Sequence, residues 1–191
     1  LHNFRGYNGE VRIPIHHDLT AFIGRNDVGK SSILDALAIF FDSSLVKFDT
    51  SDLCVYAGDK VVRIGCVFDD LPDFLTLDAT STTNLKDEYL LNKDGDLEIH
   101  KCFDCSSKSP KPRIVACALH PTADGYADLL QLKISDLKRR LEEKGVDSDG
   151  VDQRSNPSMR KALWNSCSDL QLAPTEIELN KEDAKRIWEQ L

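Results

Sequence analysis

Short stretches of polar and apolar residues near the start of the chain predict β-strands. Residues 2–7 form the first candidate strand, and the Asn-Gly pair at 8–9 is a strong hairpin-turn signal. Residues 10–16 alternate between polar and apolar, which is typical of a half-buried strand, and Pro14 favours an edge position. The apolar run at 19–23 is rich in strand formers and predicts a third strand.

A helix is predicted next, because apolar residues recur at helical spacing over 32–41. Residues 43–58 look irregular, with one short helical turn, and 71–83 shows no clear pattern. The other strand-like stretches in this part of the chain are 60–68, 86–91, 97–103 and 111–119.

The last third of the chain changes to helical patterns. Apolar residues at i, i+4, i+7 and i+11 from Leu130 to Leu141 predict an amphipathic helix that stops at Gly145. Asn180 is a plausible N-cap for a final helix. The further helices expected from the pattern are 159–167 and 181–191.

The order of these elements predicts the fold class. Strands come first, then one helix, then antiparallel strands, and finally helices, which suits an α/β domain with a largely antiparallel side sheet and a helical lobe. We expect an α/β lobe over residues 1–121 and a helical segment over 122–191.

Composition narrows the classes of function. Of the 191 residues, 41% are hydrophobic, enough for a real core, and the net charge of −8 argues against a uniformly basic nucleic-acid binder. No apolar run approaches the ~20 residues of a membrane span, and no signal peptide is visible. Six irregularly spaced cysteines then favour a reduced, cytoplasmic protein. Because the chain lacks an initiator Met and ends in a charged helical stretch, we expect it to be part of a longer protein.

The sharpest signal is a phosphate-binding loop. Residues 24–32 read GRNDVGKSS, a complete G-x-x-x-x-G-K-[ST] pattern between the predicted strand at 19–23 and the predicted helix. Gly24 lets the chain turn sharply, and Gly29 lets the backbone approach phosphates without an intervening Cβ. Successive backbone N–H groups then form an anion-binding nest, to which the helix N-terminus adds partial positive charge.

The polar residues of the loop have predicted roles toward a nucleoside triphosphate and Mg²⁺. Lys30, the candidate catalytic residue, is expected to reach the β- and γ-phosphates, and the Ser31 hydroxyl to ligate Mg²⁺. Ser32 and the backbone of Asn26 are expected to reach other phosphate oxygens. The predicted nucleotide-binding set of the loop is completed by Gly24, Asp27, Val28 and Gly29.

Two quoted segments carry a family resemblance. The start, NFRGY at 3–7, and the stretch LTAFIGRNDVGKSSILDAL at 19–37 resemble the N-terminal lobe of ABC-type ATPase heads, most closely the RecF, SMC and OLD (overcoming lysogenisation defect) group. The resemblance implies a P-loop NTPase fold of the ABC-head type, with ATP and Mg²⁺ as ligands. It also implies that Arg5 contacts a nucleotide phosphate or base. Such proteins form dimers or hetero-oligomers around ATP and act in DNA repair, DNA processing or anti-phage defence, so DNA is an expected partner of the full assembly.

Departures from that family limit the expected catalysis. The chain has no Gln between Ser31 and Leu130 to match the Q-loop, and no SGG signature. The segment at 64–70 resembles a Walker B strand, but we interpret it as an antiparallel strand because the family places Walker B far downstream. Phosphoryl transfer depends mainly on positioning and charge stabilisation. We therefore expect ATP hydrolysis to need further motifs and dimerisation, and these residues alone to have weak or no ATPase activity.

A second constellation has spacing compatible with zinc. The ligands would be Cys102, Cys105, Cys117 and His120, in the pattern C-x2-C-x11-C-x2-H. The alternative is that Cys102 and Cys117 are small core residues on paired strands. Strand-like alternation in both segments favours that alternative.

Three further interpretations remain: a DNA-contacting loop, a stand-alone P-loop enzyme and a non-catalytic module. Lys101, Lys108, Lys111 and Arg113 surround a Ser/Pro loop that could contact DNA phosphates, although an exposed hairpin is the favoured interpretation. A stand-alone P-loop kinase or GTPase would need a base-recognition motif such as N-K-x-D, which the chain lacks. A non-catalytic interaction module with a vestigial loop is the third alternative.

Overall fold

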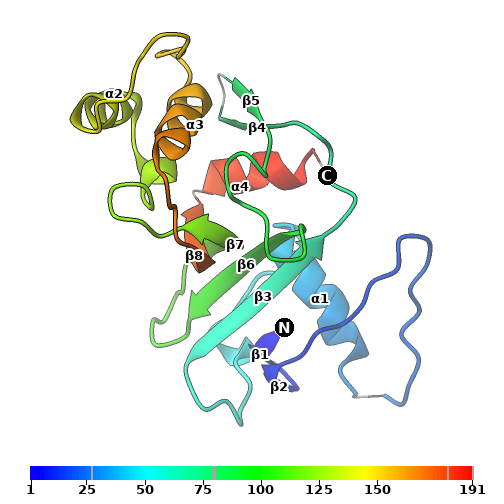
Figure 1. The fold of residues 1–191 in the computed structure, drawn as a ribbon. Helices are drawn as coiled ribbons and strands as arrows, with labels where there is room; N and C mark the ends of the chain where they lie inside the picture. The colour runs from blue at the N-terminus through cyan, green and yellow to red at the C-terminus, as the bar shows by residue number, and fades with distance from the viewer. Residues whose placement is uncertain (27, 79–80, 180, 191) are drawn as a thin grey trace. The chain divides into compact units, whose positions relative to one another are not determined.

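The structure, a computed structural model, describes residues 1–26, 28–78, 81–179 and 181–190 (Figure 1). The strands are β1 (His2–Phe4), β2 (Tyr7–Glu10), β3 (Val61–Phe68), β4 (Leu75–Asp78), β5 (Ser81–Thr83), β6 (Leu97–Asp104), β7 (Arg113–Pro121) and β8 (Leu172–Leu179). The helices are α1 (Lys30–Phe40), α2 (Ile134–Glu143), α3 (Asn156–Ser166) and α4 (Lys181–Trp188), with the short 3-10 turns η1 (Thr50–Asp52) and η2 (Leu129–Gln131).

Six of the strands form an antiparallel sheet. Their order is β2-β1-β3-β6-β7-β8, and β4 and β5 form a separate antiparallel pair. The α/β class and the antiparallel sheet predicted from the sequence are therefore confirmed. The chain divides into two compact units, Leu1–Cys66 with Ile99–Val115, and Val67–Glu98 with Ala116–Leu191.

In the first unit, a hairpin and a helix bring the N-terminal residues together. Strand β1 pairs antiparallel with β2, with His2 opposite Glu10, and with β3, with His2 opposite Arg63. Helix α1 buries one apolar face, whose residues recur at helical spacings of three and four positions. The helix residues buried on that face are Ile33, Ala36, Ile39 and Phe40.

Two predicted strands in this unit are absent. The hairpin pairing ends where Leu1 and Val11 exchange two hydrogen bonds, and no strand follows over 12–26 or at residue 28. The side chains of Leu19 and Ile23 are 79% and 93% exposed. An apolar run becomes a strand only where a neighbouring strand supplies hydrogen bonds and a face to cover. The described part of this segment has neither, so the predictions at 10–16 and 19–23 were wrong beyond β2.

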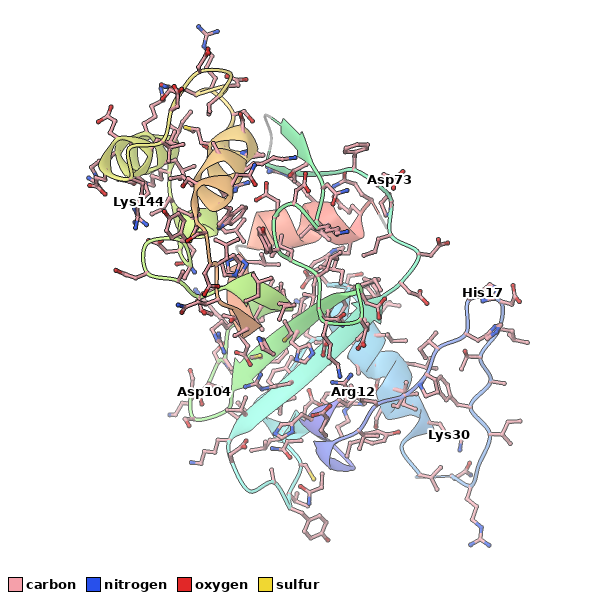
Figure 2. All side chains as sticks on the ribbon, in the orientation of Figure 1. Arg12, His17, Lys30, Asp73, Asp104 and Lys144 are labelled. Carbon is pink, nitrogen blue, oxygen red and sulfur yellow. The ribbon has the colours of Figure 1, made fainter. Side chains whose placement is uncertain are left out.

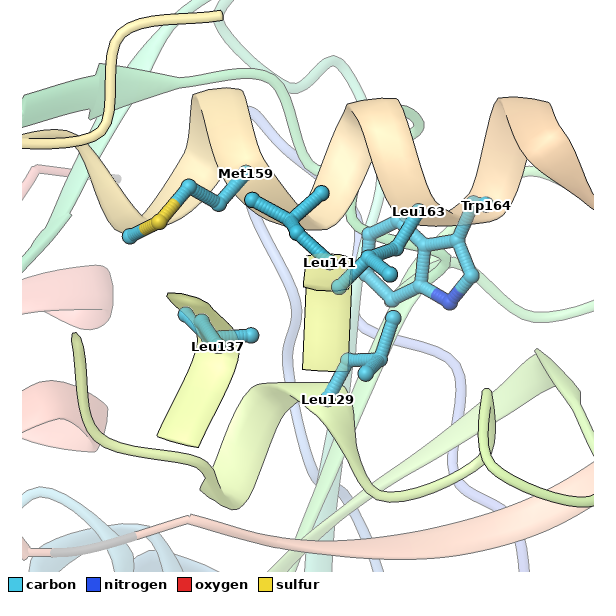
Figure 3. Packing of buried hydrophobic residues seen from close by; sticks show 6 residues of the cluster. All are labelled: Leu129, Leu137, Leu141, Met159, Leu163 and Trp164. Carbon is cyan, nitrogen blue, oxygen red and sulfur yellow. The ribbon is translucent and has the colours of Figure 1, made fainter. Parts of the chain in front are cut away.

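The second unit is built on a helical core. Leu137 and Leu141 of α2 pack with Met159, Leu163 and Trp164 of α3 (Figure 3). Leu129 of η2 completes this cluster, in which every side chain is at most 2% exposed. The predicted helices at 130–145 and 159–167 are confirmed, although α2 begins only at Ile134. The helix predicted at 181–191 is present as α4 over Lys181–Trp188, whereas its predicted N-cap Asn180 and residue 191 lie outside the described residues.

The sequence pattern misled at two places in this unit. Residues 86–91 form turns rather than a strand, because the Asn84 side chain accepts from the Lys86 N–H at 2.8 Å and starts a chain reversal. Strand β8 was not predicted from the sequence, and it contains Pro174. Proline is tolerated there because β8 is the last strand in the sheet order.

None of the described helices combines the length and the apolar character that crossing a membrane would require.

Candidate functional site

The phosphate-binding loop leads into the N-terminus of α1. The helix begins at Lys30, and its N-cap is Gly29 in the left-handed conformation, with φ of +92°. No described side chain caps this helix end, and its first turn contains no acidic residue. The first N–H groups of a helix have no partner within the helix. Together with the helix dipole they form a site suited to an anion.

Gly29 is in close contact with an aromatic residue from β2. The Tyr7 hydroxyl donates a hydrogen bond to the Gly29 carbonyl oxygen at 3.1 Å. A Cβ at Gly29 would lie 3.0 Å from that hydroxyl oxygen and 3.1 Å from the ring carbon bearing it. Contact and positive φ both require glycine at this position. The motif predicts glycine at this position because the backbone must approach phosphates without an intervening Cβ. The contact with Tyr7 is a second reason for glycine, which the motif did not reveal.

Lys30 turns back onto its own loop. Its Nζ donates to the carbonyl oxygen of Gly24 at 2.9 Å and also to that of Arg25. These bonds hold the ammonium group against the first residues of the loop. An ammonium has three rotatable donors, so Lys30 can exchange a carbonyl for a phosphate oxygen without leaving the loop.

The other predicted loop residues lie at the surface. Asn26, Val28 and Ser31 are exposed, and Ser32 is half-buried. At Gly24, a Cβ would meet the Cγ2 atom of Val28 at 3.2 Å, tighter than ordinary contact. Asp27 lies outside the described residues. The structure thus brings Gly24, Lys30 and the start of α1 together and leaves the Ser31 hydroxyl accessible.

Arg5 is engaged by two carboxylates of its own unit. Its Nε donates to Asp52 Oδ1 at 2.8 Å, and its guanidinium also pairs with Asp35. Burial opposes the charged form, yet the hydrogen bonds to Asp52 and Asp35 raise the pKa of Arg5. Since Asp35 lies on α1 and Asp52 on η1, Arg5 connects β1 with the helix that follows the loop. A nucleotide that contacted Arg5 would have to share its guanidinium with these two carboxylates.

Asn3, beside Arg5 in the NFRGY segment, has a structural environment. Its side chain is buried, and its Nδ2 donates to Asp59 Oδ1 at 3.1 Å. Its Oδ1 accepts from the Gly9 N–H at 2.9 Å, which fixes the β1–β2 hairpin. The hairpin in turn carries Tyr7, the residue against Gly29 that sequence reasoning missed. Its only sequence signal was its place at the end of the NFRGY segment.

The geometry fits a triphosphate and Mg²⁺ by the chemistry of its donors. Backbone N–H groups at an uncapped helix start and the Lys30 ammonium suit phosphate oxygens. The exposed Ser31 hydroxyl suits a hard cation that prefers oxygen ligands. A side chain at Gly29 would strain this cradle, as the contact with Tyr7 shows.

The segment that resembled a Walker B motif is an antiparallel strand. Strand β3 pairs antiparallel with β1, and the strand ends at Phe68 before the two aspartates. Asp69 and Asp70 are both exposed, and Asp70 has a positive φ of 49°. The antiparallel interpretation of this stretch is confirmed.

The candidate zinc ligands have the environments of ordinary structural residues. Cys102 is buried in β6, and burial raises the pKa of the Cys105 thiol, which disfavours the thiolate that zinc requires. His120 is buried and donates from Nδ1 to the Tyr89 carbonyl oxygen at 2.9 Å, with burial lowering its pKa. The groups of metal-ligating side chains found among the described residues do not include the set Cys102, Cys105, Cys117 and His120.

The basic cluster around the Ser/Pro loop loses one member. Lys101 is only 1% exposed, and its Nζ contacts Asp42 Oδ1 at 2.9 Å and the Ile39 carbonyl oxygen at 3.2 Å. It therefore supports the end of α1 instead of a surface for DNA phosphates. Lys108, Lys111 and Arg113 remain exposed.

Comparisons with known proteins agree with the loop geometry. The chain matches the family model described as the AAA ATPase domain over residues 1–191. No curated protein and no solved structure matched it. An ATPase domain binds nucleotide, which agrees with the uncapped start of α1 and with the position of the Lys30 ammonium. From its sequence and its phosphate-binding loop together, the chain belongs to the AAA ATPase domain family, and its function is that of an ATP-binding ATPase domain.

Proposed function

We propose that the chain is the ATP-binding lobe of an ABC-type ATPase of the RecF, SMC and OLD group, acting in DNA repair, DNA processing or anti-phage defence. The observation that carries the nucleotide part is the start of α1. There a helix without a side-chain cap follows Gly29 at φ +92°, and the Lys30 ammonium lies over the loop. The NFRGY segment and the loop sequence support the choice of group.

The binding residues act by charge and by position. Lys30 exchanges its bonds to the Gly24 and Arg25 carbonyl oxygens for bonds to the β- and γ-phosphates. The N–H groups of the first turn of α1 point at the phosphates, and the Ser31 hydroxyl ligates Mg²⁺. When bound, Mg²⁺ neutralises phosphate charge and orients the terminal phosphoryl group.

Hydrolysis is proposed to depend on residues beyond this chain. The described aspartates after β3 are exposed, and the sequence has no SGG signature. Positioning supplies most of the catalysis in phosphoryl transfer, so binding without these groups gives little turnover. We propose that a Walker B strand and a signature motif are supplied by further sequence and by a partner head in a dimer, with DNA bound by the full assembly.

Calorimetry with ATP and Mg²⁺ tests the nucleotide part. Lys30→Ala should weaken ATP binding by at least about tenfold, since it removes a charged hydrogen bond worth about 1.5–3 kcal/mol. Lys47→Ala, which removes an exposed lysine of the same unit, is the control and should leave the affinity unchanged. Equal affinity in all three proteins, or no binding by any, contradicts the proposal, and the second result favours the vestigial loop.

ATPase assays test the dependence on further residues. The 191-residue chain should show little turnover even at saturating ATP. Robust turnover that Lys30→Ala abolishes would contradict this part and would return attention to Asp69 and Asp70.

A further inference from the structure

The second unit contains a pocket that the phosphate-binding loop does not use. Its volume is about 560 Å³, within the ~300–1,000 Å³ that small-molecule sites occupy. Residues from the turn at 84–95 form one side, and residues of α3 form another. All of its lining residues belong to the second unit and are described.

Two aromatic side chains stand at this pocket in a fixed arrangement. The rings of Tyr89 and Trp164 meet edge to face, with their centroids 5.1 Å apart at 76°. The Trp164 indole N–H donates to the Tyr126 carbonyl oxygen at 3.0 Å, and the ring rests on the buried leucines shown in Figure 3. Tyr89 is only half-buried, so part of this residue can meet a ligand. Aromatic faces favour flat, π-bonded partners.

The backbone of Tyr89 is held in a conformation that bulky residues rarely adopt. Its φ is +52°, in the left-handed region. Its N–H donates to the Lys86 carbonyl oxygen at 3.1 Å, and its own carbonyl oxygen accepts from His120 Nδ1 at 2.9 Å. Strain of this kind persists only where the surroundings over-determine it, and it clusters at ligand sites.

A buried ion pair fixes the turn against α3. Glu88, next to Tyr89, accepts from Arg160 Nε at 2.7 Å and from Arg160 Nη2 at 2.9 Å, and both side chains are at most 6% exposed. The Thr83 hydroxyl donates to the same carboxylate at 2.8 Å. Arg160 precedes Lys161 and Trp164 on α3, so this pair sets the two sides of the pocket relative to each other. The pocket is therefore preorganised.

The charge around the pocket is opposite to that of the chain. Lys86, Lys93 and Lys161 line it and are exposed, whereas Asp87 is the one acid among its described lining residues. Asp87 is engaged by Lys161 at 2.9 Å. The pocket thus carries a local charge of about +2 in a chain of net charge −8. Such a positively charged pocket attracts an anionic ligand to a protein whose net negative charge otherwise repels anions.

We propose that this pocket binds the nucleotide moiety of a ligand, with the base against Tyr89 and the phosphate beside Lys86 and Lys93. The amide of Asn165, an exposed lining residue, offers both a donor and an acceptor to the edge of the base. This site lies in the other unit from the phosphate-binding loop and takes a phosphate by side-chain charge, not by backbone N–H groups. A free nucleoside monophosphate and a single-stranded nucleic acid both present this chemistry.

Fluorescence of Trp164 reports binding in a protein whose first site is disabled. The background carries Lys30→Ala, so that nucleotide binding at the phosphate-binding loop does not contribute to the signal. It also carries Trp188→Phe, which leaves Trp164 as the single tryptophan. Titration with AMP, with GMP and with a short single-stranded oligonucleotide should change the emission saturably. Saturation by the monophosphates identifies a free nucleotide as the source, and saturation by the oligonucleotide alone identifies a strand.

Two variants separate specific binding from a general charge effect. Lys86→Glu with Lys93→Glu should weaken the affinity about tenfold or more, by reversing two exposed charges. The matched control reverses Lys133 and Lys138, exposed lysines of the same unit outside the pocket lining, and should have little effect. Tyr89→Asn removes the ring while keeping a residue that tolerates positive φ, and should also weaken binding about tenfold.

Three results would overturn the proposal. They are no saturable change with any of the three probes, equal loss in the pocket and control lysine variants, and competition by inorganic phosphate as effective as that by AMP. Circular dichroism and urea unfolding of each variant establish that the fold is retained. Should Tyr89→Asn unfold the unit, the lysine comparison alone decides.

Discussion

The Tyr7 hydroxyl donates a hydrogen bond to the carbonyl oxygen of Gly29 at 3.1 Å, across 22 positions of sequence. The contact joins strand β2 to the residue that caps helix α1. Tyr7 therefore supports the last residue before α1 in the phosphate-binding loop, although it does not belong to the loop motif. Figure 2 draws the described side chains as sticks on the ribbon and labels Lys30.

Gly29→Ala should damage both the loop and the fold of the first unit. The new Cβ meets Tyr7 at 3.0 Å, and φ of +92° adds a conformational cost of about 1–2 kcal/mol for an L residue. We expect a lower free energy of unfolding in urea together with weaker ATP binding. Gly58→Ala is the control, because a Cβ there meets nothing within 4 Å and no positive φ is recorded. Equal behaviour of the two variants would contradict the role of Gly29.

Tyr7→Phe should isolate the hydroxyl from the ring. The substitution keeps the packing against Gly29 and removes one hydrogen bond, which typically contributes about 0.5–1.5 kcal/mol. We expect a destabilisation of that size in urea unfolding and a smaller loss of ATP affinity than in Gly29→Ala. A loss of affinity without any loss of stability would instead place the hydroxyl on the ligand.

Substitutions at Arg5 and Asp35 test whether Arg5 only supports the fold or also contacts the nucleotide. Asp35→Asn weakens the ion pair that connects β1 with α1, so it should lower the stability of the first unit. Arg5→Lys should lower stability as well, because Lys cannot reproduce the fork that reaches both Asp35 and Asp52. Calorimetry with ATP then separates the roles. If Arg5 also contacts nucleotide, Arg5→Lys should reduce affinity more than Asp35→Asn does.

The buried pair of Glu88 and Arg160 should be essential to the second unit. Glu88→Gln leaves the Arg160 guanidinium buried with a neutral partner, and breaking such a pair typically costs about 3–5 kcal/mol. Asp87→Asn is the neighbouring control, since its pair with Lys161 is exposed to solvent and should contribute little to stability. Urea unfolding measures both. Similar small effects in the two variants would show that burial does not strengthen this pair.

Asp128 should make a pH-dependent contribution to stability. Its two carboxylate oxygens accept from Arg140 at 3.0 Å each, and these hydrogen bonds lower its pKa below the ordinary value of 3.8. A lowered pKa in the folded state means that the contribution is present above pH 3.8 and is lost as the pH falls through the folded value. Because the side chain is 46% exposed, solvent screening limits the contribution to about 1 kcal/mol or less.

Unfolding of the wild type and of Asp128→Asn from neutral to acidic pH measures this contribution. The difference in their free energies of unfolding should shrink below pH 3.8. A difference that stays constant down to strongly acidic pH would mean that the interaction does not depend on the charge of Asp128.

Patterns within a few residues were sufficient for much of this protein. The spacing of apolar residues located α1, α3 and the strands β3, β6 and β7, because a helix or a strand that buries one face repeats that face locally. The loop motif also predicted roles for Lys30 and both glycines, since a phosphate-binding turn needs those residue types at those spacings.

Other features depended on partners far away in the sequence. The run at 19–23 looks like a strand but lacks a pairing neighbour among the described residues. Lys101 is buried because it finds partners in a carbonyl oxygen at the end of α1 and in Asp42, just beyond that helix. Glu88 meets Arg160 across 72 positions. No local pattern encodes such a contact, because burial and pairing arise only when the folded chain brings distant segments together.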